Sequence, residues 1–321
     1  MLPSNIPMSP RTWMLATLAI VLVVGGAIVG TNMIKDIYGL YRSSDGRRLP
    51  VLGDERVAKY LLAMRYVPEN FDAIIAGASI TANWDVAKLD KLRVYNGSLN
   101  GGNIVEERAL IEAALERQGI SAVLLVVHPA MTYAHMFRTV EMKPELRRSA
   151  LGSLSLWDAY KNLIRIRLGL ESQEYDYAGT DQHLKLSSEM NINMREMWGA
   201  SEFTIDPIAL KCYKDLVSSL RARGIQIIFI VPPTSERVLT TKRGALENYV
   251  RRMRSEIGAG DLWMDLTGDD FDDFRKNPRN FADGVHLTQS GAKQIVATIR
   301  STVNVWIAQR QLIVKAHSQA D

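Results

Sequence analysis

Short, wholly apolar runs separated by helix-length segments constrain the fold of this chain more than any other feature. The clearest runs are Ala73–Ala76, Ala122–Val127 and Ile227–Val231. A run without polar positions is typical of a strand that is buried on both faces of a parallel sheet. Helices between the strands imply right-handed crossovers within one sheet. The sequence therefore predicts an α/β fold built around a parallel sheet.

Further segments continue the same alternation of strand and helix. We expect two more strands, at residues 92–96 and 262–266. Helical periodicity or helix-ending signals mark five segments, at residues 57–64, 105–118, 213–223, 245–257 and 289–309. Gly119 and Gly224 follow two of these helices, at the position where glycine commonly ends a helix.

The alternation breaks between residues 128 and 203. Residues 146–170 have the pattern of one or two amphipathic helices, and a polar tract follows them. We interpret the region as a helical insertion over the carboxyl ends of the strands, where ligands bind in sheets of this kind. A helical side layer remote from any site is the alternative.

The N-terminal segment is a candidate membrane span. No charged residue occurs between Arg11 and Lys35, and residues 13–34 are almost wholly apolar. A helix of about 20 such residues crosses the hydrocarbon core of a bilayer. A cleaved signal peptide is the alternative. We expect an uncleaved anchor, with residues 1–34 forming a cytoplasmic tail and the span, 35–56 a polar stalk, and 57–321 the folded domain.

Composition excludes several classes of function. The chain has 39 basic and 35 acidic residues, a balance that does not indicate nucleic-acid binding. Its single cysteine, Cys212, excludes an internal disulfide. Histidine, cysteine and carboxylate residues do not follow a metal-binding spacing, so we expect no metal. Gly101 and Gly102 lack the Lys-Ser/Thr of a phosphate-binding loop, and we expect no cofactor.

Two short patterns contain the candidate catalytic residues. In the first, the apolar strand at Ala73–Ala76 leads into Gly77-Ala78-Ser79. A serine on such a turn exposes its hydroxyl at the edge of the sheet. In the second, Asp283 and His286 form an Asp-x-x-His step before a helix. A hydroxyl nucleophile needs a base and a group that orients the base, so the two patterns fit one relay of Ser79, His286 and Asp283.

These motifs resemble those of the SGNH/GDSL hydrolase superfamily, from about Phe71 to the helix after His286. The resemblance implies a three-layer α/β/α sandwich with a parallel sheet, preceded here by one transmembrane helix. It also implies that Ser79 is the nucleophile, His286 the base and Asp283 its partner. The layout is similar to that of membrane-anchored members encoded with bacterial exopolysaccharide and cell-wall acylation systems.

The resemblance is weaker at the oxyanion hole. Residues 94–103 are similar to the second block of the family, which implies that the backbone N–H of Gly101 acts with that of Ser79; Asn103 is a further candidate. The third block of the family often carries an asparagine that donates a third hydrogen bond. Residues 126–132 have none. His128, or a backbone amide near Ala130, is the candidate replacement.

We therefore expect a serine esterase or O-acyltransferase acting on O-acetyl groups of an extracellular polysaccharide. Its expected partners are that polysaccharide, the bacterial inner membrane and other exopolysaccharide-assembly proteins. The resemblance places the domain in the periplasm, whereas the positive charges after the span favour the cytoplasm. A catalytically silent polysaccharide-binding or scaffold component is the alternative function, and the absent asparagine favours it.

Overall fold

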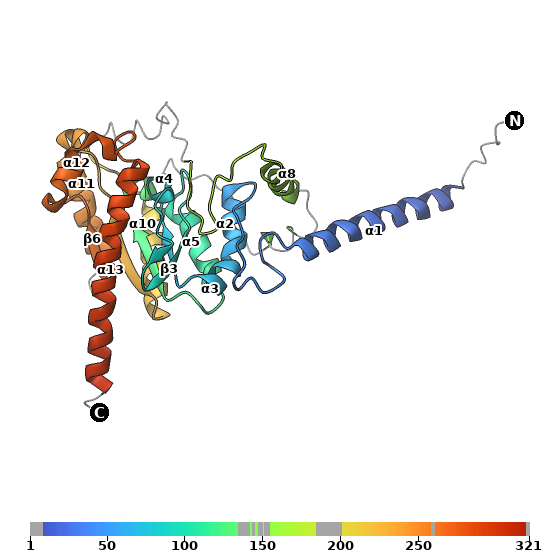
Figure 1. Ribbon diagram of the computed structural model, residues 1–321, viewed down its shortest axis with the longest axis horizontal. Coiled ribbons are helices and arrows are strands. Elements are labelled where there is room, and N and C mark those ends of the chain that lie inside the picture. The colour runs from blue at the N-terminus through green and yellow to red at the C-terminus, as the bar shows by residue number, and fades with distance from the viewer. Residues whose placement is uncertain are drawn as a thin grey trace.

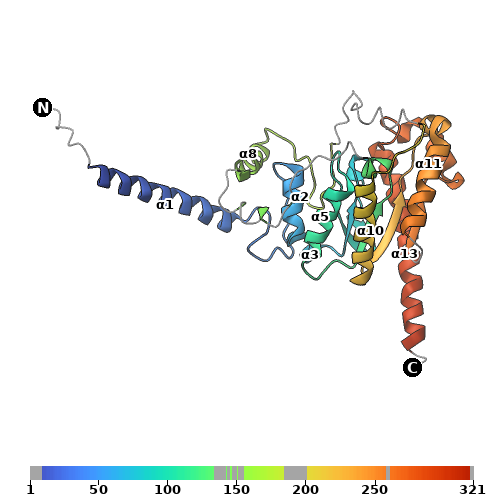
Figure 2. The same ribbon diagram turned by 180° about the vertical axis from the view of Figure 1, so that it is seen from behind.

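A computed structural model shows a six-stranded sheet between layers of helices (Figures 1 and 2). The structure describes residues 9–133, 142, 145–146, 150, 155–183, 201–257 and 261–318. The order of the strands across the sheet is β2-β3-β1-β4-β5-β6. Their bounds are β1 Ala73–Ala76, β2 Lys88–Leu89, β3 Leu92–Asn96, β4 Ala122–Val126, β5 Gln226–Val231 and β6 Leu262–Asp265. Five strands are parallel, and only the two-residue β2 pairs antiparallel, with β3, at one edge.

The central strands alternate between two hydrophobic cores. In β4, Val123 and Leu125 contribute to one core, and Leu124 and Val126 contribute to the other. Every residue of β4 is buried, because helices cover both faces of the sheet. This explains why the sequence of β4 contains no polar position. The predicted α/β fold with a parallel sheet between two helical layers is confirmed.

The helices divide between the two faces. The first core packs under α2 (Glu55–Ala63), α3 (Tyr66–Asn70), α5 (Ile104–Ala114), α10 (Pro207–Ala222) and α11 (Glu236–Ile257). The second core packs mainly under α13 (Gln289–Ser318), through Ile295, Ile299 and Val303. Short helices lie at the ends of strands, namely α4 (Ser79–Ala82), α6 (Pro129–Thr132) and α12 (Asp272–Lys276). Figure 1 shows that α13 continues well beyond the sheet.

The N-terminal helix α1 (Pro10–Lys35) projects from the domain (Figure 1). Its 26 residues correspond to about 39 Å at 1.5 Å per residue, which exceeds the roughly 30 Å of a hydrocarbon core. It is the one described helix that is long and apolar enough to cross a membrane; by these criteria a signal sequence would also qualify.

The segment between α1 and α2 lies against the domain rather than forming a stalk. Tyr38, Leu40 and Leu52 are buried in the first core. The Asp36 carboxylate accepts hydrogen bonds from the N–H groups that follow the helix, those of Leu40, Tyr41 and Arg42. The polar composition of the segment concealed this packing, since a few apolar side chains spaced along a loop suffice to bind it to a core.

The region expected to be an insertion is described in part, because residues 134–141, 143–144, 147–149, 151–154 and 184–200 lie outside the described residues. Helix α8 (Ser155–Arg167) lies in the helical layer beside α2, at the end of the domain from which α1 leaves (Figures 1 and 2). Residues 174–183 return to the sheet. There the N–H of Asn96 donates to the carbonyl of Ala178 at 2.7 Å, and that of Asp181 donates to the carbonyl of Ala82 at 2.8 Å. This tract, not α8, lies next to the carboxyl ends of the strands.

Candidate active site

Ser79 is the first residue of α4, two residues after the end of β1 and its parallel strand. The turn requires glycine at position 77. A Cβ atom there would approach Val126 Cγ2 to 2.8 Å and would also overlap the hydroxyl of Thr81. The chain therefore passes close to β4 before it reverses into α4, and Ser79 emerges at the carboxyl edge of the sheet.

The loop that carries Asp283 and His286 is fixed to the same edge. Its two ends pair through an isolated bridge between Phe281 and Leu287. The carbonyl of Leu287 accepts a hydrogen bond from the Asn83 side chain, which follows α4, at 2.8 Å. On the other side, the carbonyl of Gly284 accepts from the N–H of Ser235 at 2.9 Å. The loop is thus held between the turn of Ser79 and the segment that follows β5.

The structure brings the three predicted residues together. Ser79 Oγ lies 2.8 Å from His286 Nε2, although the two residues are 207 positions apart in the sequence. His286 Nδ1 lies 2.7 Å from Asp283 Oδ2. The histidine is buried, whereas the aspartate side chain is 39% exposed. Both distances are within the range of hydrogen bonds between a nucleophile, its base and an orienting carboxylate.

Backbone groups hold the Asp283 carboxylate in place. Its Oδ1 accepts hydrogen bonds from three successive backbone N–H groups, those of Gly284, Val285 and His286. Partial burial raises the pKa of Asp283, but the hydrogen bonds and the charge of His286 outweigh it, so the pKa lies well below its ordinary value. The ionised carboxylate fixes the proton of the neutral imidazole on Nδ1 and leaves the lone pair of Nε2 toward Ser79.

His128 lies at the end of β4, beside the strand of Ser79, and is almost wholly buried. Its Nδ1 accepts a hydrogen bond from the N–H of Ala130 at 3.2 Å. Burial, together with the smaller effect of the nearby charge of His286, lowers the pKa of His128 to about 3. The ring is therefore neutral near pH 7, with its proton on Nε2.

The glycine loop of residues 97–103 runs beside the turn of Ser79. The N–H of Leu99 donates to the carbonyl of Gly77 at 3.0 Å, and Leu99 forms a bridge with Ala78. Gly101 has a φ of +64°, which favours glycine. Asn103 has a different role from the one expected of it. Its buried side chain caps α5, accepting from the N–H groups of Val105 and Glu106.

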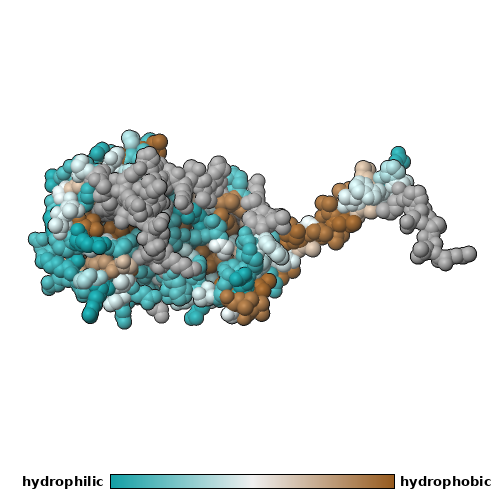
Figure 3. Space-filling view, turned by 90° about the horizontal axis from the view of Figure 1, so that it is seen from above, coloured by the Kyte–Doolittle hydropathy of each residue, from teal (hydrophilic) through white to brown (hydrophobic). Residues whose placement is uncertain are grey.

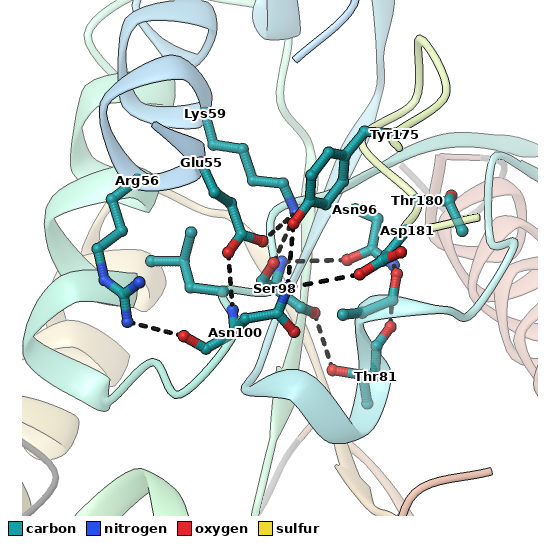
Figure 4. Close-up of polar contacts among 12 residues, drawn as sticks. Glu55, Arg56, Lys59, Thr81, Asn96, Ser98, Asn100, Tyr175, Thr180 and Asp181 are labelled. Atoms are coloured by element: carbon teal, nitrogen blue, oxygen red, sulfur yellow. Dashed lines mark hydrogen bonds and ion pairs between the residues drawn. The ribbon is translucent and has the colours of Figure 1, made fainter. Parts of the chain in front are cut away.

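Asn96 was not among the candidates predicted from the sequence, but it fixes the turn that carries Ser79. Its fully buried amide donates to three carbonyls at the end of α4, those of Thr81, Ala82 and Trp84. Its Oδ1 accepts from the N–H of Ser98, whose hydroxyl lies 2.8 Å from that of Thr81. Figure 4 shows these contacts between the end of β3 and α4. The only sequence signal was a polar residue at the end of an apolar strand.

Three charged residues of α2 hold the glycine loop from the other side (Figure 4). Lys59 is fully buried and its Nζ donates to the carbonyl of Ser98 at 2.6 Å. Arg56 donates to the carbonyl of Asn100 at 2.8 Å, and Glu55 accepts from the N–H of the same residue at 3.1 Å. Each contact is to the backbone of the loop, so α2 sets the path of the chain on either side of residue 99.

Comparisons with known proteins give limited information. Neither a protein-family model nor a curated protein matches the sequence. Among solved structures, the chain is similar to a candidate platelet activating factor from Streptococcus pneumonia, with a TM-score of 0.43 and 9% identity over 92% of this chain and 99% of that chain. It is also similar to a GDSL-like lipase from Bacteroides thetaiotaomicron, with a TM-score of 0.37 and 11% identity over 72% of this chain and 87% of that chain. Likeness at this level carries no functional argument, so function must be argued from the geometry of the site.

Proposed function

We propose that the protein is a membrane-anchored serine esterase or O-acyltransferase. The observation that carries the proposal is the continuous hydrogen-bonded relay from Ser79 Oγ through the His286 ring to the Asp283 carboxylate. Three polar groups from two distant parts of the chain meet there in the order that nucleophilic acyl transfer requires. A protein that only bound a ligand would not need a base within hydrogen-bond distance of a serine hydroxyl.

The relay allows a two-step reaction. Ser79 Oγ attacks the carbonyl carbon of an ester while His286 Nε2 takes the hydroxyl proton. His286 then returns this proton to the departing alcohol, which leaves an acyl group on Ser79. In the second step, water or a sugar hydroxyl attacks the acyl group and gives its proton to His286, which passes it to Ser79 Oγ as the bond between the acyl group and Ser79 breaks. Asp283 stabilises the imidazolium that forms in each step.

We propose that three donors stabilise the oxyanion. Two are the backbone N–H groups of Ser79 and Gly101, which lie on neighbouring loops. The third is His128, because its neutral ring carries a proton on Nε2 and it occupies the end of β4, where the resembled family often has asparagine. Removal of one such donor costs about 10²–10³ in rate. His128→Phe should therefore lower kcat with little change in the fold.

The substrate and location follow from the resemblance and remain part of the proposal. We propose O-acetyl groups of an extracellular polysaccharide as substrate, with water or a sugar hydroxyl as acceptor. Helix α1 would anchor the protein in the bacterial inner membrane with the domain in the periplasm. Other exopolysaccharide-assembly proteins are the proposed partners. The positive charges that follow the span, including Arg47 and Arg48, argue for the opposite orientation.

Hydrolysis of a small soluble ester tests the proposal. The detergent-solubilised full chain should hydrolyse p-nitrophenyl acetate, and Ser79→Ala and His286→Ala should each abolish most of this activity. The double variant should be little worse than either single variant, because the two residues act as a unit. His183→Ala, which changes an exposed histidine outside the relay, is the control and should retain activity. A folded wild-type protein no more active than Ser79→Ala would contradict the enzyme proposal and favour a scaffold function.

A further inference from the structure

Helix α8 presents an apolar stripe to solvent. Trp157 and Ile164 of α8 have exposed fractions of 65% and 56%, and Leu168, the residue that follows the helix, has an exposed fraction of 67%. Their spacings of seven and four residues place them on one face of the helix. Leu170, just after the helix, is 66% exposed. A contiguous apolar surface of this kind on a soluble domain usually marks a binding surface.

The opposite face of α8 fixes its orientation. Leu156 and Ala159 are buried in the first core, and Leu163 and Ile166 pack against that core. The helix therefore has two apolar surfaces in the folded domain. One packs against the core, and the other faces solvent. The second apolar stripe cannot turn inward without removing the first from the core.

The stripe lies next to the end of the candidate membrane span. Tyr160 of α8 donates its hydroxyl hydrogen to Asn32 Oδ1 of α1 at 2.9 Å. Asn32 also donates to the carbonyl of Ala150 at 3.5 Å. Figures 1 and 2 show α8 at the end of the domain from which α1 leaves, with α12 and α13 at the other end. Figure 3 shows apolar surface on this part of the domain beside α1.

The polar residues around the stripe suit a lipid surface. Lys161 lies between Trp157 and Ile164 on the same face and pairs with Asp158, Arg165 pairs with Glu171, and Arg167 leaves the helix and the turn after it with a basic excess. Long basic side chains can keep their charge in the headgroup region while their stems lie along apolar surface. Tryptophan concentrates at the same depth, because its ring is apolar and its N–H is polar. Helices of this composition lie in the plane of the membrane interface.

We propose that α8 lies in the interface of the bilayer that α1 crosses. The occupant of the stripe is then lipid rather than a second protein, since the stripe adjoins the residues where the span enters the domain. This inference rests on the membrane anchoring that is part of the proposed function, but not on the proposed esterase or acyltransferase reaction. A second attachment beside the span would fix the tilt of the domain and hold the carboxyl edge of the sheet at a set orientation to the membrane.

Spin labels on the full chain, reconstituted in vesicles of phosphatidylcholine and phosphatidylglycerol, test the docking of α8. Cys212→Ala provides a background without cysteine, and single cysteines then replace Ile164, Val305 or Val21. Val305 is a matched control, because it is 55% exposed and belongs to α13, the helix at the end of the domain away from α1 in Figure 1. Val21 reports on the span itself. For each label, the collision rate with oxygen, which concentrates in lipid, is compared with the collision rate with a water-soluble nickel chelate.

The Ile164 label should collide severalfold more with oxygen relative to the nickel chelate than the Val305 label does, and should approach the Val21 label. An Ile164 label that behaves like the Val305 label, while the Val21 label is in lipid, would overturn the docking and leave the anchor intact. A Val21 label in water would overturn the anchoring and the docking together. A thermal unfolding transition like that of the unlabelled protein verifies that each labelled protein is folded.

Discussion

Replacement of Asn96 by alanine should loosen the turn that carries Ser79. The Asn96 amide connects the end of β3 to α4, and Ser79 is the first residue of α4. Alanine cannot bond to the three carbonyls at the end of that helix, nor accept from the N–H of Ser98. We therefore expect a loss of stability and a loss of reactivity at Ser79 from the same substitution.

The expected loss can be estimated from the hydrogen bonds. The amide has two N–H groups, shared among the three carbonyls, and one accepting oxygen, so alanine removes the equivalent of about three hydrogen bonds. At about 1 kcal/mol each, the loss is about 3 kcal/mol. The carbonyls are left in a fully buried site, which adds to the loss rather than reducing it. For a domain of this size, about 3 kcal/mol corresponds to a decrease in Tm of about 6–12 °C.

Thermal unfolding of the full chain in detergent measures this loss, and the rate of ester hydrolysis measures the effect on Ser79. Asn162→Ala is the control. Asn162 makes one side-chain hydrogen bond to Glu171 at the surface, so its loss should change stability by no more than about 0.5 kcal/mol. The reasoning would be refuted if the free energy of unfolding of Asn96→Ala lay within about 1 kcal/mol of the wild-type value, because the buried amide would then contribute no more than about one hydrogen bond.

Three further predictions concern charge and topology. The folded-state pKa of Asp283 lies below its ordinary value of 3.8, so its stabilising contribution is present above that pH and is lost as the pH falls below it. The difference in Tm between the wild type and Asp283→Asn should therefore shrink as the pH falls below about 4. Burial raises the pKa of Glu107 well above 4.5, although Lys59 opposes this, so ionisation of the buried carboxyl costs stability as the pH rises above its ordinary pKa. Glu107→Gln should match the wild-type Tm at low pH and exceed it at pH 7. Alkaline phosphatase fused after Asp321 should be active if the domain lies outside the cytoplasm, and an inactive phosphatase with an active cytoplasmic reporter would reverse the proposed topology.

The sheet was predictable from the sequence because its central strands, β1 and β4, are buried along their whole length. An uninterrupted apolar run such as Ala122–Val126 has few other environments in a folded protein. The edge strand β2 was not predicted, because Lys88 and Leu89 form only two residues of ladder with no sequence period. Residues 35–56 were expected to form a stalk, since polar composition does not reveal that Tyr38 and Leu40 reach the core.

The site was predictable where chemistry imposes a local pattern. Gly77 and Ser79 share one tight turn, and Asp283 and His286 share one loop, so each pair leaves a short motif in the sequence. The residues that hold these loops leave no such motif. Lys59 and Asn96 act across the fold through backbone carbonyls, and a carbonyl carries no sequence signal. The same reason explains Asn103, whose capping role depends on where α5 begins.

Covalent labelling by a fluorophosphonate tests the central claim most directly. The reagent bonds to a serine hydroxyl only when a neighbouring base activates it. Mass spectrometry of the labelled wild-type protein should find the adduct on Ser79, and His286→Ala should label far more slowly. Ser218→Ala, which removes an exposed serine of α10, should label like the wild type. A wild-type protein that is folded but unlabelled, or an adduct that persists in Ser79→Ala, would contradict the assignment of Ser79 as the nucleophile.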